Sequence, residues 1–117
     1  MTFGRDEHLQ RLAALEKDIA AAVKRYGTGD IESIRLAQGA EEADVSCNVD
    51  LSVRSQGQGE RVFTVLSLSG VNRLLGEEAA EDFYTAGGPL IIVGQMSADV
   101  IARGILKYLR MERVLER

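Results

Sequence analysis

The stretch from Val45 to Val53 alternates apolar and polar residues without a break, and this constrains the fold more than any other feature. An alternation of period two is typical of a β-strand with one buried and one solvated face. The segment 55–60 (SQGQGE) then supplies two glycines for a turn. Because Arg61–Ser69 returns to β-type residues, the middle of the chain is predicted to be an antiparallel hairpin. The residues expected to point inward from its first strand are Val45, Cys47, Val49, Leu51 and Val53.

A helix is predicted on each side of this hairpin. In Asp6–Tyr26 the apolar positions recur at spacings of three and four, and Gly27 is predicted to end the helix in the left-handed conformation. The stripe comprises His8, Leu12, Leu15, Ile19, Ala22 and Tyr26, and it is expected to pack on the sheet. Ala98–Leu115 follows Ser97 as N-cap, and its apolar face holds Ile101, Ile105, Tyr108 and Leu109.

Four shorter elements complete the prediction. Ile31–Ala37 is expected to be a first strand, and Gly70–Gly76 a short helical turn or loop. Glu77–Tyr84 has the acidic first turn of a short helix, and Leu90–Val93 is predicted to be a short strand that is central or covered on both faces. Residues 1–117 are therefore predicted to form a single α+β domain, in which an antiparallel four-stranded sheet packs against N- and C-terminal helices on one face.

Composition narrows the classes of partner. The formal net charge is −4, which argues against nucleic acid or an anionic membrane as the main partner. The apolar run 89–93 is far too short to span a bilayer. The single cysteine, Cys47, allows no internal disulfide and is expected to be a small buried hydrophobe. A cytoplasmic protein, monomeric or homodimeric, is expected.

Residues that could carry chemistry are few. The one histidine, His8, and Cys47 make neither a nucleophile–base pair nor a metal site of His and Cys ligands. Gly57 and Gly59 lie between two strands and lack the spacing of a phosphate-binding loop. We therefore expect neither enzymatic activity nor a cofactor or metal ion.

Four segments carry a resemblance to a known family: IESIRLA at 31–37, VDLSVRSQGQGERVFTVLSLSGVNRLL at 49–75, TAGGPLIIV at 85–93 and MSADVIARGILKYL at 96–109. In order and spacing they resemble the immunity proteins of bacterial polymorphic-toxin systems, in the group catalogued as immunity protein eight. They resemble the family's opening strand, its glycine-containing hairpin with a leucine-rich turn, its short aliphatic strand and its final helix. The helix expected over Asp6–Tyr26 precedes the family's usual start.

The resemblance implies a non-enzymatic protector that binds a cognate toxin in the cytoplasm of the producing cell and blocks its active site. Many such toxins are basic nucleases, so an acidic inhibitor gains association rate and specificity from complementary charge. The expected contact surface is acidic and comes from two connections of the chain. It comprises Glu41, Glu42, Asp44, Glu77, Glu78, Glu81 and Asp82.

Other functions remain open at this stage. A small-molecule or effector-binding module would use the end of the last strand, where Gly94, Gln95 and Ser97 precede a helix. An enzyme of unrecognised type would use Asp50, Glu60 or the acidic helix as acid and base. A short, acidic chain also fits two further functions. One is a phage-type inhibitor of a host enzyme, and the other is a homodimeric scaffold built on the first helix.

Overall fold

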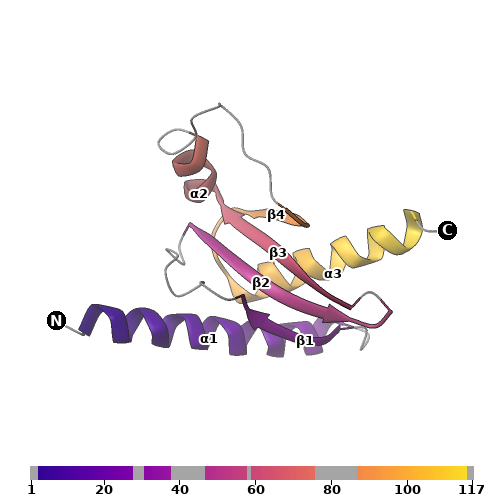
Figure 1. Ribbon diagram of the computed structural model, residues 1–117, viewed down its shortest axis with the longest axis horizontal. Coiled ribbons are helices and arrows are strands. Elements are labelled where there is room, and N and C mark those ends of the chain that lie inside the picture. The colour runs from indigo at the N-terminus through magenta and orange to yellow at the C-terminus, as the bar shows by residue number, and fades with distance from the viewer. Residues whose placement is uncertain (1–2, 28–30, 38–46, 58, 76–86, 116–117) are drawn as a thin grey trace.

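Three helices and four strands make up the described part of the chain (Figure 1). The computed structural model describes residues 3–27, 31–37, 47–57, 59–75 and 87–115. In chain order the elements are α1 (Phe3–Tyr26), β1 (Ile31–Leu36), β2 (Asn48–Ser55), β3 (Gly59–Ser67), α2 (Leu68–Arg73), β4 (Leu90–Val93) and α3 (Ala98–Leu115). The α+β class and the two terminal helices are confirmed. The predicted helix over Glu77–Tyr84 lies outside the described residues.

The sheet is mixed, whereas a purely antiparallel sheet was predicted. Its strand order is β1-β2-β3-β4, and the pairs β1–β2 and β2–β3 are antiparallel. The β3–β4 pair is parallel, with Thr64 opposite Leu90 and Ser67 opposite Val93. The antiparallel prediction was wrong because the connection 68–89 is not a hairpin turn. A segment of this length allows β4 to run in the same direction as β3, beginning opposite Thr64.

The predicted hairpin is confirmed, with its boundaries shifted by a few residues. Ser55 lies opposite Gly59, and the register continues to Asn48 opposite Leu66. Gly57 (φ 79°) and Gly59 (φ 69°) both adopt the left-handed conformation that glycine tolerates without strain. Val45, the first residue of the alternating stretch, lies outside the described residues.

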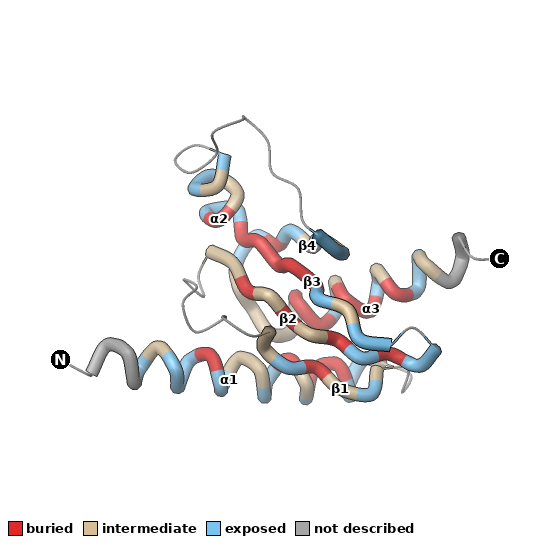
Figure 2. The backbone as a smooth tube through the Cα atoms, in the orientation of Figure 1, coloured by how far each residue is buried: buried red, intermediate tan, exposed pale blue. Residues whose placement is uncertain are grey.

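One face of the sheet carries the hydrophobic core. Figure 2 shows the buried middle of β2 and β3, and α1 and α3 cover the same face. The ring of Phe63 is fully buried and meets Tyr108 of α3 edge to face, with ring centroids 5.4 Å apart. The inward residues of the two central strands are Val49, Leu51, Val53, Phe63 and Val65. They pack against Ile19, Ala22 and Val23 of α1 and against Ile101, Ala102, Ile105, Leu106 and Leu109 of α3.

Helix α1 packs against α3 and β1. Gly27, which follows it, does not adopt the predicted left-handed conformation. Close packing explains the residue instead, since a Cβ there would lie 2.6 Å from the Val23 carbonyl oxygen and 3.3 Å from Leu106 Cδ2. Tyr26 is half-exposed at the end of the helix, where its hydrogen bond to Asp99 of α3 raises the pKa of the phenol. This bond ties the end of α1 to the start of α3.

Strand β4 is an edge strand, not the doubly covered strand that its apolar run predicted. Val93 is buried in the core, but Ile92 is 56% exposed and Leu90 38% exposed on the other face. An unbroken apolar run does not show whether a strand is covered on one face or on both, and the prediction of two covered faces was wrong.

Strand β3 ends at Ser67, two residues earlier than predicted, because α2 begins there. Ser67 is the N-cap of α2, and its Oγ accepts a hydrogen bond from the Gly70 amide at 3.1 Å. Gly70 is buried against Cys47, whose carbonyl oxygen accepts from the Ser67 amide at 3.0 Å. The turn before β2 and the start of α2 are thus held together by backbone contact.

Gly70→Ala is expected to destabilise the fold. A Cβ at this position would overlap the Cys47 carbonyl oxygen, and backbone on both sides leaves little room to adjust. We expect the free energy of unfolding, measured by urea titration, to fall by about 1–3 kcal/mol. Gly87→Ala is the matched control, because a Cβ there has open space. Equal stability of the two variants would contradict the close approach.

The Arg61–Glu112 ion pair is expected to make stability depend on pH. It joins β3 to α3 through two hydrogen bonds of 2.6 and 2.8 Å, and both side chains are about three-quarters buried. The hydrogen bonds from Arg61 hold the pKa of Glu112 below its ordinary value of 4.5. The stabilisation is therefore present above the carboxyl pKa of the unfolded chain and is lost as the pH falls through the lower folded-state pKa.

For this pair the test is Glu112→Gln, which should lower the free energy of unfolding at neutral pH by about 1–3 kcal/mol. The difference from the wild type should shrink as the pH is taken below about 4. Urea titrations at several pH values measure both quantities. A difference that is constant with pH would show that the charge of Glu112 contributes nothing.

Candidate functional site

Two surfaces of the described residues are candidates for function: the exposed face of the sheet and a pocket at one edge of it. The first lies opposite the helices. We call it the open sheet face, and it comprises Arg35, Ser52, Arg54, Glu60, Val62, Leu90 and Ile92. In the register, Arg35 pairs with Ser52, Ser52 with Val62, and Arg54 with Glu60. Leu90 and Ile92 lie opposite Thr64 and Leu66, farther from the hairpin turn.

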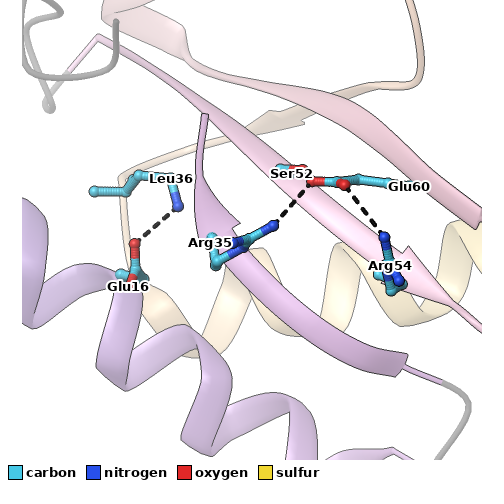
Figure 3. A network of polar contacts seen from close by, with 6 residues as sticks. All are labelled: Glu16, Arg35, Leu36, Ser52, Arg54 and Glu60. Carbon is cyan, nitrogen blue, oxygen red and sulfur yellow. Dashed lines mark hydrogen bonds and ion pairs between the residues drawn. The ribbon is translucent and has the colours of Figure 1, made fainter. Parts of the chain in front are cut away.

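An ionic cluster lies at the hairpin end of this face (Figure 3). The Glu60 carboxylate accepts a hydrogen bond from the Ser52 hydroxyl and lies 3.3 Å from Arg35 and 3.7 Å from Arg54. The Ser52 hydrogen bond and then the two guanidinium groups hold the pKa of Glu60 below its ordinary value. A carboxyl group held ionised in this way is a poor proton donor at neutral pH, so the geometry gives no support to Glu60 as a general acid.

The apolar part of the open sheet face lies beside the cluster, across β3 and β4. Val62 is 47% exposed, and Leu90 and Ile92 are exposed to a similar degree. Thr64 and Leu66, which point to the same side of β3, are buried. The exposed apolar side chains therefore border the cluster without forming one continuous stripe along the sheet.

The two edges of the sheet differ. At the β1 edge, the Glu16 carboxylate of α1 accepts a hydrogen bond of 2.9 Å from the Leu36 amide (Figure 3). A helix side chain thus satisfies a backbone donor that an edge strand would otherwise present to solvent. The β4 edge lies on the other side of the sheet, next to the exposed Leu90 and Ile92.

A pocket of about 410 Å³ lies where β3 and β4 end. Because the two strands are parallel, their carboxyl ends meet at one edge, and the first half of α1 closes the opposite wall. Its polar lining comes from Arg11, Ser67, Ser69 and Gln95, and Leu15, Gly94 and Met96 complete it. Gly94 and Gln95 were expected here, but Ser97 is not part of the lining; its carbonyl oxygen accepts from the Ile101 amide at 2.9 Å.

The acidic contact surface predicted from the sequence lies outside the described residues. This holds for Glu41, Glu42, Asp44, Glu77, Glu78, Glu81 and Asp82 alike. Cys47, predicted to point inward from a strand, lies in the turn before β2 and is half-buried. Within the described ranges, no cluster of histidine, cysteine and carboxylate side chains could hold a metal ion.

Sequence reasoning missed Arg11, Ser67, Ser69 and Met96 as pocket residues, because both the parallel β3–β4 pairing and the position of α1 are needed to bring them together. By contrast, Arg54 and Glu60 are cross-strand partners in the hairpin register. This pairing could have been predicted by counting outward from the turn. Among the described helices, none has a stretch long and apolar enough to cross a membrane.

No family model, no curated protein and no solved structure matches this chain.

Ser52→Ala is expected to raise the pKa of Glu60 toward its ordinary value, because it removes the strongest interaction that favours the ionised form. An NMR titration of the Glu60 side-chain carboxyl carbon measures this pKa directly. Asp50→Asn is a suitable control, since Asp50 faces the same side of β2 without contributing to the pKa shift of Glu60. An unchanged pKa in Ser52→Ala would mean that the arginines alone hold Glu60 ionised.

Proposed function

We propose that this protein is an immunity-like inhibitor, which binds a cognate bacterial toxin and blocks its active site without catalysing a reaction. The observation that carries the proposal is the open sheet face. Both long helices pack on the other side of the sheet, so this face presents a rigid surface, with backbone positions held by the β-ladders. A rigid surface suits an inhibitor because little conformational entropy is lost on binding.

The composition of the open sheet face also fits a protein partner. Protein interfaces combine an apolar centre with a polar rim. Here the same face carries exposed Val62, Leu90 and Ile92 on β3 and β4. It also carries the charged Arg35, Arg54 and Glu60 on β1, β2 and the start of β3. The charged side chains already pair with one another, so a partner would meet an ordered pattern of charge.

The acidic residues predicted from the sequence belong to the same proposal. Segment 38–46 joins β1 to Cys47, and segment 76–86 follows α2. Cys47 contacts Ser67 and Gly70 at the start of α2, so both segments leave the described elements near the same end of the sheet. Seven carboxylates in these segments would attract a basic toxin domain and speed its association. We place this interaction in the cytoplasm of the producing cell.

The first test is a pull-down with the tagged protein from the cells that produce it, followed by mass spectrometry. The proposal expects capture of a toxin domain at stoichiometric level, loss of that domain's activity in the complex, and rescue of growth when both are co-expressed. Capture of a non-toxin host enzyme would favour a phage-type inhibitor instead. A captured toxin that keeps its activity would contradict the proposed function.

Substitutions on the two surfaces then locate the contact. Val62→Arg with Ile92→Arg should weaken toxin binding roughly 30-fold, because charge is placed in the apolar centre. Leu9→Arg is the control, since Leu9 is 40% exposed on α1, away from the open sheet face.

Reversing the charges of Glu77, Glu78, Glu81 and Asp82 should mainly slow association and reduce its salt dependence. Calorimetry and stopped-flow kinetics measure these effects, and unchanged values would exclude the surface concerned.

A further inference from the structure

We propose that the pocket at the carboxyl ends of β3 and β4 binds a small aliphatic monocarboxylate. This inference is independent of the inhibitor function, because the pocket lies between α1 and the sheet edge and shares no residue with the open sheet face.

The position of the pocket favours a ligand. Parallel strands that end together and continue into helices leave a crevice at their carboxyl ends, and such crevices are the usual ligand sites of open sheets that contain parallel strands. Here β3 leads into α2 and β4 leads into α3 at the same edge. A volume of about 410 Å³ is within the range of pockets that hold small molecules.

The charge of the lining selects an anion. Among the described residues that line the pocket, Arg11 alone is ionisable, and it is exposed. A guanidinium group presents two parallel N–H donors that match the two oxygens of a carboxylate. One fixed positive charge balances a monocarboxylate, whereas a phosphate dianion would leave charge uncompensated.

The remaining lining describes the rest of the ligand. Leu15 and Met96 are partly buried and also pack against the core, so they form a fixed apolar wall. Gln95 and the hydroxyls of Ser67 and Ser69, whose oxygens lie 2.9 Å apart, add polar groups close to that wall. A short alkyl chain that ends in a carboxylate meets both parts of the lining.

Gly94 provides a way to fill the pocket without disturbing the fold. A Cβ at this position has no heavy atom within 4 Å, and the backbone is not in the left-handed region. A side chain at Gly94 therefore meets no steric obstacle, and because Gly94 lines the pocket, a long side chain there is expected to reduce the room for a ligand. Gly87 has the same freedom but does not line the pocket, so it is the matched control.

The test is a titration with hexanoate, followed by two-dimensional NMR of the ¹⁵N-labelled protein. We expect saturable shifts of the Ser69, Gly94 and Gln95 amides. Hexanamide, which keeps the chain and removes the charge, should bind at least about tenfold more weakly. Inorganic phosphate, which keeps an anion and removes the chain, should also bind more weakly.

Variants separate the two parts of the site. Arg11→Gln should weaken hexanoate binding by about tenfold or more, and Lys17→Gln, an exposed substitution elsewhere on α1, should leave it unchanged. Gly94→Met should abolish binding, whereas Gly87→Met should not. Thermal unfolding of each variant checks that the fold is retained.

Three results would overturn the proposal. The first is no saturable shift with hexanoate up to about 10 mM, because the affinity would then be below the millimolar range of simple fragments. The others are equal binding of hexanamide or phosphate to the wild type, and equal binding of hexanoate to Arg11→Gln. These results do not depend on toxin binding, so failure here leaves the inhibitor proposal unaffected, and the reverse also holds.

Discussion

Burial of one face of the β2–β3 hairpin is the interaction on which the rest of the structure depends. Val49, Leu51, Val53, Phe63 and Val65 supply the apolar centre of the core, to which α1, β1, β4 and α3 all contribute buried residues. Helix α3 packs across it through Ile101 and Ile105, and α1 packs against α3 and β1. Because all this packing uses one face, the other face of the sheet is left available for the ionic cluster and the exposed apolar residues. The proposed inhibitor surface is thus a consequence of how the core is built.

Local patterns in the sequence were sufficient for the elements that have them. The period of two in β2 and the spacing of three and four in α3 each report directly which face is buried, and the turn glycines locate the hairpin. The same reasoning failed where the answer depends on distant parts of the chain. The direction of β4 is defined by its pairing with β3, and its exposure depends on contacts with residues far away in the sequence. Neither is encoded in the four residues LIIV.

The two candidate sites also differ in how far the sequence alone predicts which residues lie together. The partners of Glu60 are close in sequence across the hairpin, so register alone predicts that Arg54 is opposite. Arg11 and Gln95 come from opposite ends of the chain, and only the complete fold places them around one pocket. Gly94 and Gln95 were identified beforehand because they follow a predicted strand and precede a predicted helix. The acidic residues 41–44 and 77–82 were identified by charge alone, and they lie outside the described part of the chain.

The parallel pairing of β3 with β4 has a consequence for how sequences of this kind can diverge. A tight hairpin fixes its own length, since an added residue changes the register of both strands. The connection 68–89 is under no such constraint, because β4 is positioned by its ladder with β3 and by α3. The entropy of closing a flexible loop grows slowly, by about 0.6 kcal/mol for each doubling of its length. A change in the number of residues between α2 and β4 is thus thermodynamically inexpensive, so chains of this kind can differ there in length and charge while the pairing of β3 with β4 stays the same.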